Sequence, residues 1–238
     1  MLYIVGTPIG NLEDISMRAI RILGEVDFIL CEDTRTSRVL LDHYNIKTPC
    51  ISYHQHSDDI KVDQIIKLLE QGKNLALITD AGTPGISDPG GVLVEKVLEH
   101  FGEDMKIESV PGPSAVTAAL SISGIPTDKF IFMGFPPHKK GRQTFIRRIL
   151  ESEYPVVVYE SKHRIVKFLN ELKAAKESAS ISDEEDLKNK KKNLESVVVA
   201  REISKMHETV YRGDIDNIIA QITATPDDQR GEFVVIVG

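Results

Sequence analysis

Six short segments of the chain are rich either in glycine and proline or in acidic, basic and hydroxyl side chains, and each follows a short apolar run. They are GTPIGN (6–11), EDTR (32–35), DAGTPGISDPG (80–90), PGPSA (111–115), YESKHR (159–164) and AREISK (200–205). Carboxylates accept protons, guanidinium groups hold phosphates, and glycine lets a backbone approach a ligand closely. Open α/β sheets bind ligands at the carboxyl ends of their strands, so we expect these segments to form one functional cleft.

The glycine-rich segments lack the spacing of the common phosphate-binding motifs. Segment 6–11 does not follow the G-x-G-x-x-G pattern, and no G-x-x-x-x-G-K-[ST] pattern occurs in the sequence. A loop rich in glycine and poor in cations suits a ligand recognised by backbone amides rather than through phosphates. His54 and His56 are residue types that ligate metals, and Asp58 and Asp59 lie nearby in the sequence. None of the nearby residues has the spacing that is typical of a third metal ligand. We therefore expect a polar strand end and no metal.

The composition is that of an ordinary globular protein. Of the 238 residues, 41% are hydrophobic and 27% are charged, and the formal net charge is −7. This charge argues against a protein that coats nucleic acid or anionic membrane with its whole surface, but it leaves room for a local basic patch. Cys31 and Cys50, the two cysteines, support neither a disulfide framework nor a thiolate zinc site. With no signal-peptide pattern and no apolar stretch of membrane-spanning length, we expect a cytoplasmic protein without membrane contact.

Short apolar runs alternate with segments of helical period, which predicts an α/β fold with a largely parallel sheet. The expected strands are residues 2–5, 27–31, 74–79, 106–110, 130–133, 155–159, 196–200 and 232–237. Apolar residues have helical spacing over 15–23, 60–69 and 92–98, and Ser16 is a candidate N-cap. The turn-rich sequence near residue 112 favours two α/β domains, 1–112 and 113–238, over one large sheet.

Two charged stretches stand out in the second predicted domain. Residues 174–193 are polar, of mixed charge and without apolar period, which predicts a mobile surface loop. Residues 138–148, HKKGRQTFIRR, are basic and contain no acidic residue. The cations are Lys139, Lys140, Arg142, Arg147 and Arg148, and Lys162 and Arg164 extend the patch if their loop lies beside it. Such a basic stretch is either an RNA-binding surface or a solvated helix face.

Several long motifs occur in an order that resembles one known family. They include LYIVGTPIGNLEDISMRAIRIL, EDTRTSRVLLDHY, SYHQHSDD, LITDAGTPGISDPG, VPGPSAVTAALSISGIPTDKFIFMGF, VVARE and RGEFVVIVG. The sequence is similar to the 16S ribosomal RNA (cytidine-2′-O)-methyltransferases, which belong to the tetrapyrrole-methylase-like superfamily. The resemblance runs from Leu2 to Gly238 apart from the polar stretch 174–193.

The resemblance implies two α/β domains of the tetrapyrrole-methylase type, with S-adenosylmethionine in the cleft between them, in a homodimer. It further implies methylation of the ribose 2′-hydroxyl of a cytidine in the decoding region of 16S rRNA, within the small ribosomal subunit. The positions it brings to the cofactor are Pro8, Ile9, Asp80, Gly82, Thr83, Pro84, Ile86, Ser114, Ala115, Tyr159 and Ala200. For Ile9, Ala115 and Ala200, a place in the hydrophobic core is an equal alternative.

Transfer of a methyl group to a hydroxyl needs a group that takes the proton, and the sequence leaves the choice of this base open. The candidates in the polar loops are Glu32, Asp33, Glu160 and Lys205, while Arg35 is suited to hold a phosphate or orient a carboxylate. A structural ion pair between Asp33 and Arg35 at a helix start is an equal alternative. Because a fold does not fix its substrate, methylation of a tetrapyrrole or another small acceptor is the alternative function.

Overall fold

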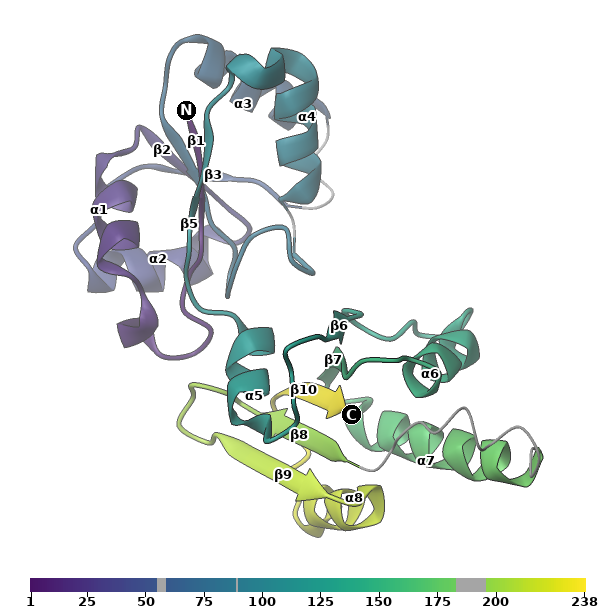
Figure 1. The fold of residues 1–238 in the computed structure, drawn as a ribbon. Coiled ribbons are helices and arrows are strands. Elements are labelled where there is room, and N and C mark those ends of the chain that lie inside the picture. Colours follow the sequence, from purple (N-terminus) through teal and green to yellow (C-terminus); the bar gives the residue numbers. More distant parts are fainter. Residues whose placement is uncertain (55–58, 89, 183–195) are drawn as a thin grey trace. The chain divides into compact units, whose positions relative to one another are not determined.

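The computed structural model describes residues 1–54, 59–88, 90–182 and 196–238 of the chain (Figure 1). The chain divides into two compact units, Met1–Ser114 and Ala115–Gly238. Each unit contains one five-stranded sheet with helices packed against it. The predicted α/β fold class is therefore confirmed.

The sheet of the N-terminal unit is parallel throughout its described strands. These are β1 (Leu2–Val5), β2 (Phe28–Cys31), β3 (Cys50–Ser52), β4 (Leu75–Leu77) and β5 (Ile107–Val110), in the order β3-β2-β4-β1-β5. Helices cover both faces of the sheet, which is why its strands are apolar runs rather than alternating patterns. Parallel strands end at the same edge, so the loops that follow β1 to β5 all begin there.

Two helices pack on each face of this sheet. The helices α1 (Met17–Glu25) and α2 (Thr34–His43) share one hydrophobic cluster, and α3 (Asp59–Glu70) and α4 (Gly91–Phe101) share the other. Short 3₁₀ turns lie at Leu12–Asp14 and Gly102–Asp104. The predicted N-cap of α1 is confirmed, because the hydroxyl of Ser16 accepts a hydrogen bond from the amide of Ala19 at 3.1 Å.

The neighbouring strands β1 and β4 lead to helices on opposite faces of the sheet. The chain continues from β1 to α1 on one face, and from β4 to α4 on the other. In open α/β sheets, adjacent strands whose loops diverge in this way mark the usual position of a ligand. The topology therefore predicts a ligand site at the loops that follow β1 and β4.

The sheet of the C-terminal unit corrects the prediction of largely parallel strands. Its strands are β6 (Ile131–Phe132), β7 (Val156–Ser161), β8 (Val197–Arg201), β9 (Thr209–Gly213) and β10 (Glu232–Val237), in the order β6-β7-β10-β8-β9. The β6–β7 pair is parallel, whereas β7–β10, β10–β8 and β8–β9 are antiparallel. The cause is the connection from β8 to β9, which reverses the chain without a crossover helix.

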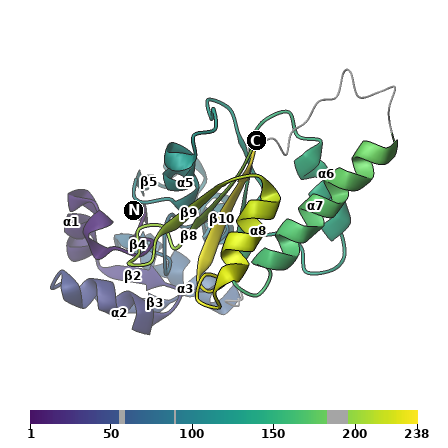
Figure 2. The ribbon, with the colours of Figure 1, turned by 90° about the horizontal axis from the view of Figure 1, so that it is seen from below.

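Helices lie on both sides of this second sheet. The helices α6 (Arg142–Leu150), α7 (Ile165–Ser182) and α8 (Ile215–Ala224) bury Ile149, Phe168 and Ile218 in one cluster with the strands. The helix α5 (Ala115–Ser123) lies against β10, and Figure 2 shows it on the other side of the sheet from α7 and α8. The helices α6 to α8 therefore cover one face of the sheet, and α5 lies on the other face.

The prediction of a mobile loop over residues 174–193 is wrong for its first part, because α7 continues to Ser182. The helix is anchored by Leu172, and Ala175 still packs against the core, after which Lys176 and Glu177 are exposed. Alanine, lysine and glutamate are strong helix formers, so the helix extends beyond its buried face without an apolar period. Residues 183–193 lie outside the described residues.

Candidate functional site

The loops that follow β1 and β4 are joined by a short antiparallel bridge. The amide of Thr7 donates to the carbonyl of Gly82 at 2.9 Å, and the amide of Gly82 donates back to the carbonyl of Thr7 at 3.1 Å. The buried hydroxyl of Thr7 also donates to the carbonyl of Thr79 at 3.1 Å. These bonds fix the first glycine of the DAGTPGISDPG segment against the loop that follows β1.

The loop that follows β5 touches the β1 loop through two glycines. A Cβ atom on Gly6 would lie 2.8 Å from the Cα of Gly112, and a Cβ atom on Gly112 would lie 2.6 Å from the carbonyl oxygen of Gly6. Real Cβ atoms do not approach backbone atoms so closely, so each position requires glycine. Three of the segments predicted from the sequence therefore meet at one edge of the N-terminal sheet.

Replacing Gly6 with alanine is expected to lower the free energy of unfolding by about 1–3 kcal/mol, the usual cost of overpacking. Gly24 in α1 provides the matched control, because nothing lies within 4 Å of its Cβ position. Gly24→Ala should raise the free energy of unfolding by about 0.5–1 kcal/mol, since alanine favours a helix interior over glycine. Urea denaturation of both variants checks this, and equal stabilities would contradict the close approach of the two loops.

Backbone conformation explains why the DAGTPGISDPG segment is rich in glycine. Gly82, Gly85 and Gly90 have φ angles of 83°, 86° and 142°, which residues with a Cβ rarely adopt. A Cβ atom on Gly82 would lie 3.6 Å from the side chain of Ile9 and 3.9 Å from the carbonyl oxygen of Pro113. The positive φ angles therefore account for the glycines of this segment.

The polar groups of these loops fit a ligand with a positive centre. Asp80 and Asp88 are exposed, and Thr83 and Ser114 contribute hydroxyls, whereas residues 6–11, 80–90 and 111–115 contain no lysine or arginine. The positions predicted near a cofactor in this unit lie in the three loops; they are Pro8, Ile9, Asp80, Gly82, Thr83, Pro84, Ile86 and Ser114. The sulfonium and amino groups of S-adenosylmethionine suit this acidic, backbone-lined surface.

Ionisable side chains gather where β3, β2 and β4 end side by side. Glu32 follows β2, His54 follows β3 and Asp80 follows β4. Partial burial, and then the negative charge of Asp80, raise the pKa of Glu32 above its ordinary value, while His54 opposes the shift. A carboxylate with a raised pKa beside a candidate ligand loop has the properties expected of a general base.

Asp33 and Arg35 form the structural ion pair that was the alternative to their catalytic role. Asp33 is the N-cap of α2 and accepts from the amide of Arg35 at 2.8 Å, while its other oxygen is 2.7 Å from Arg35 Nη2. Side-chain hydrogen bonds from Arg35 lower the pKa of Asp33 to about 2. Asp33 is consequently a very weak base, and Glu32 has the better-matched pKa of the two.

In the C-terminal unit, the structure aligns two of the predicted cofactor residues. Tyr159 on β7 and Ala200 on β8 are both paired in register with Val234 on the strand between them. Residues directly opposite each other point to the same face of a sheet. The row Tyr159–Val234–Ala200 therefore lies on the face opposite to the cluster formed with α6 to α8, and Ala115 begins α5 against β10.

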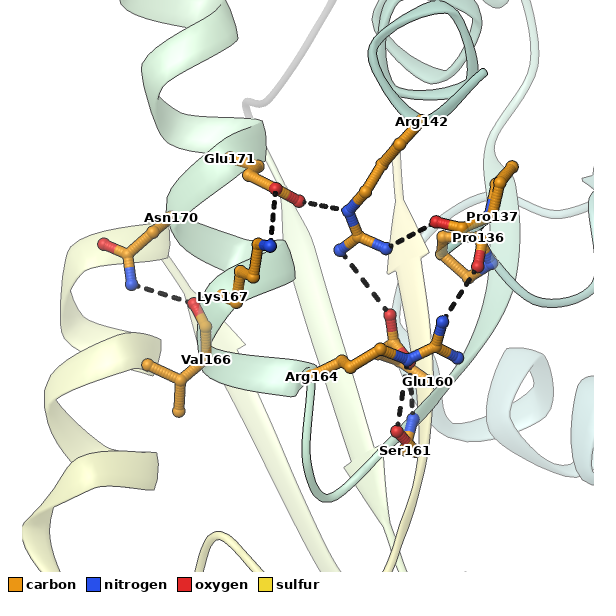
Figure 3. Close-up of polar contacts among 10 residues, drawn as sticks. All are labelled: Pro136, Pro137, Arg142, Glu160, Ser161, Arg164, Val166, Lys167, Asn170 and Glu171. Atoms are coloured by element: carbon orange, nitrogen blue, oxygen red, sulfur yellow. Dashed lines mark hydrogen bonds and ion pairs between the residues drawn. The ribbon is translucent and has the colours of Figure 1, made fainter. Parts of the chain in front are cut away.

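Glu160, the neighbour of Tyr159 on β7, points to the other face and lies among buried charges (Figure 3). Its carboxylate is 2.8 Å from Arg164 Nε and 3.8 Å from Arg142 Nη2. Arg142 Nε is also 2.6 Å from Glu171, whose other oxygen is 3.9 Å from Lys167 Nζ. We call Arg142, Glu160, Arg164 and Glu171 the buried charge cluster.

The buried charge cluster is at odds with three roles proposed from the sequence. Glu160 has a fully buried side chain, so it does not present a carboxylate to a substrate hydroxyl. The side chains of Arg142 and Arg164 are 6% and 18% exposed and are held by carboxylates, which removes them from the RNA-binding surface. The remaining cations of that prediction are exposed; they are Lys139, Lys140, Arg147, Arg148 and Lys162.

Lys205, the last candidate base, is held as a cation. Burial alone would lower its pKa, but hydrogen bonds to Glu232 and Glu202 raise the pKa above the ordinary value. Its Nζ lies 2.8 Å from Glu232 and 3.0 Å from Glu202. Lys205 is therefore protonated at neutral pH and is unsuited to accept a proton.

No group of metal-ligating side chains is present within the described ranges of the chain. Of the metal-ligand candidates in the sequence, His54 belongs to the group around Glu32. His56 and Asp58 lie outside the described residues. Within the part of the chain that is described, no helix is long and apolar enough to cross a membrane.

The sequence of the chain matches a known protein family. Residues 1–219 match the model of the tetrapyrrole (corrin/porphyrin) methylases. The chain belongs to the tetrapyrrole methylase family. Solved structures of tetrapyrrole methylases share its fold: a cobalt precorrin-4 methyltransferase has a TM-score of 0.65 at 19% identity, covering 100% of this chain and 94% of that one. A precorrin-6Y methylase from Archaeoglobus fulgidus has a TM-score of 0.57 at 15% identity, covering 100% and 96%.

Relatives with much higher sequence identity carry the name ribosomal RNA small subunit methyltransferase I. The Thermotoga maritima protein is 41% identical, with 99% of this chain and 97% of the relative covered. The Haemophilus influenzae protein is 40% identical, with 100% and 78% covered, and the Escherichia coli O157:H7 protein is 36% identical, with 99% and 77% covered. The resemblance to ribosomal RNA methyltransferases is thereby confirmed over nearly the whole chain.

Proposed function

We propose that this protein uses S-adenosylmethionine to methylate the ribose 2′-hydroxyl of a cytidine in the decoding region of 16S rRNA. The observation that carries the proposal is the glycine-built, cation-free loop group of the N-terminal unit, found in a chain about 40% identical to ribosomal RNA small subunit methyltransferases. Its substrate in this proposal is the small ribosomal subunit in the cytoplasm, and the active form is a homodimer.

The residues of the N-terminal loops hold and orient the cofactor in this proposal. When bound, S-adenosylmethionine supplies an electrophilic methyl group. The backbone around Gly82 and the hydroxyls of Thr83 and Ser114 bind its polar groups, while Asp80 and Asp88 favour its positive charge. Fixing the acceptor hydroxyl in line with the methyl carbon contributes much of the rate enhancement of such a transfer. Tyr159 is the proposed cofactor contact of the C-terminal unit, whereas Ala200 is fully buried and takes the alternative place in the core.

Glu32 is the proposed general base. It removes the proton of the 2′-hydroxyl, and its raised pKa makes it a stronger proton acceptor than an ordinary carboxylate. Asp33 orders the start of α2, and Arg35, whose side chain is 89% exposed, remains a candidate for a phosphate contact. The exposed cations Lys139, Lys140 and Lys162 are the proposed phosphate contacts of the C-terminal unit.

The acid limb of the pH–rate profile distinguishes Glu32 from Asp33. Activity falls as the pH drops through the pKa of the base, because only the ionised form accepts a proton. For Glu32 the limb lies above the ordinary range of a glutamate, whereas Asp33, with a pKa of about 2, gives a flat profile down to strongly acidic pH. Asp80→Asn removes a charge that raises the pKa of Glu32, so the limb should move to lower pH.

Initial rates at saturating cofactor, measured from pH 4.5 upward on wild type, Asp80→Asn and Glu32→Gln, check this prediction. Glu32→Gln is the control, because it removes the titrating group and with it the limb. A limb that persists in Glu32→Gln, or that stays in place in Asp80→Asn, would assign the base to another residue.

Transfer of a labelled methyl group from S-adenosylmethionine tests the function itself. The acceptors to compare are small ribosomal subunits that lack the modification and a porphyrin precursor. Label on a cytidine 2′-oxygen of 16S rRNA supports the proposal. The alternative function is methylation of a tetrapyrrole, which is favoured by the fold shared with corrin-modifying enzymes, and label on the porphyrin precursor alone would establish it. Sedimentation of the purified protein checks the proposed homodimer.

A further inference from the structure

An exposed aromatic ring stands at the carboxyl end of β6. Phe135 is 51% exposed, although phenylalanine is usually buried. Its ring lies 5.4 Å from the ring of Tyr159, which is also 4.9 Å from the ring of Phe132 in an edge-on contact. One edge of Phe135 is thus supported by aromatic neighbours while much of the side chain faces solvent.

The backbone around Phe135 is fixed from both sides. The carbonyl of Gly134 accepts from the amide of Tyr159 at 2.9 Å. The next two carbonyls, of Pro136 and Pro137, accept from Arg164 Nη1 and Arg142 Nη1, each at 3.1 Å (Figure 3). Both arginines are anchored by Glu160, so the buried charge cluster holds this loop by its backbone. The exposed ring is therefore presented by a rigid loop and not by a flexible one.

Basic residues follow Phe135 along the chain. His138, Lys139 and Lys140 are exposed and follow the two prolines, and residues 129–150 contain no acidic residue. The turn that carries the exposed residues Lys162 and His163 is tied to the same loop through Arg164 and Pro136. A local basic surface with an aromatic ring is thus present in a chain of net charge −7.

We propose that Phe135 stacks on a nucleobase of single-stranded RNA, while Lys139, Lys140 and Lys162 hold the adjoining phosphates. Proteins bind single-stranded RNA through this combination of an aromatic face and nearby cations. A ring that is already fixed loses little conformational freedom on binding, which favours a contact with a mobile strand. This inference rests on the proposed function, because it takes RNA as the acceptor.

Four variants separate stacking from other roles. Phe135→Ala removes the ring, Phe135→Leu keeps apolar bulk without a π face, and Phe135→Trp restores a larger aromatic face. Phe130→Ala is the matched control, since Phe130 is 40% exposed and lies just before β6. The measurements are the affinity for a fluorescent single-stranded RNA with the sequence around the target cytidine, KM and kcat on small subunits, and calorimetry with S-adenosylmethionine.

Phe135→Ala and Phe135→Leu should weaken RNA affinity by about 5- to 150-fold, the range for loss of one stacked base. Phe135→Trp and Phe130→Ala should bind like wild type, and the affinity for S-adenosylmethionine should not change. Because Phe135→Ala removes no charge, the salt dependence of its RNA affinity should match that of wild type. In Lys139→Gln/Lys140→Gln the slope of log affinity against log salt should fall by about 1.4, for two phosphate contacts on a single strand.

Three results would overturn the inference. Wild-type RNA affinity in Phe135→Leu would show that no π face is used. A parallel loss of S-adenosylmethionine affinity would make Phe135 a cofactor contact, and a changed sedimentation coefficient in Phe135→Ala would make it part of an interface between copies. Failure of the proposed function is seen separately, because it would leave wild type without methyl transfer to subunits, whatever the Phe135 variants do in the binding assay.

Discussion

Replacing Glu160 with alanine is expected to lower the free energy of unfolding by about 3–5 kcal/mol, because the change leaves buried cations without their shared carboxylate. Arg142 is 6% exposed and would retain only Glu171 as an ion-pair partner in the buried charge cluster. Arg164 would lose a carboxylate at 2.8 Å. Denaturant unfolding followed by circular dichroism measures the change.

Glu151 provides the control on a neighbouring element. It pairs with Arg147 at 3.8 Å, and both side chains are about two-thirds exposed, at 67% and 68%. Removing such a surface pair changes the stability by about 0.2–1 kcal/mol at most. If Glu160→Ala and Glu151→Ala had similar effects, the buried charge cluster would contribute nothing beyond a surface ion pair. Glu160→Gln distinguishes charge from shape, because it keeps the volume of the side chain.

Alanine at Gly82 should weaken S-adenosylmethionine binding by about 5- to 150-fold, which corresponds to the usual cost of overpacking. Gly82 is buried, and the new methyl group would lie 3.6 Å from the side chain of Ile9 and 3.9 Å from the carbonyl oxygen of Pro113. It would also strain the backbone at φ 83° and disturb the bridge to Thr7. Calorimetric titration of the variant gives the affinity.

Gly72 provides a control that separates the effect of the methyl group at residue 82 on cofactor binding from the general cost of a positive φ angle. Its φ is 77°, and nothing lies within 4 Å of its Cβ position, so Gly72→Ala carries the same backbone penalty away from the loops. Both variants should lose about 1–2 kcal/mol of stability, the cost of a left-handed conformation for a residue with a Cβ. Only Gly82→Ala should lose affinity for S-adenosylmethionine. Equal affinities of the two variants for this cofactor would place its site elsewhere.

Most of the N-terminal unit could be predicted from the sequence, because its strands are buried on both faces and appear as apolar runs separated by helical segments. The strand β3 was missed, since Cys50–Ser52 is too short and too polar to form such a run. The strand β9 was missed because Thr209–Gly213 is an edge strand with polar residues, paired on one side with β8. The direction of the second-unit strands was predicted wrongly because β9 was missed, and with it the direct connection from β8 that reverses the chain.

The loops of the candidate site were predictable from their glycines, but the roles of single side chains were not. Glu160 was a candidate base because it follows a buried run, yet strand alternation places it on the face of Val158 and away from Tyr159. The i,i+4 spacing of Lys167 and Glu171 on α7 is a helical ion-pair signal that the sequence offers, whereas the pairing of Glu160 with Arg164 depends on the turn between β7 and α7. The exposure of Phe135 depends on the packed loop and has no sequence signal of its own.

The position of β10 has a consequence for folding during synthesis. It is the last strand of the chain, yet it lies in the middle of its sheet between β7 and β8, and it pairs with both. The N-terminal unit has all of its strands once Val110 has left the ribosome, so it can fold while the rest is translated. The C-terminal sheet must wait, because β7 and β8 have no common partner until Glu232–Val237 emerges. A nascent chain stalled before that strand would expose two apolar strand edges.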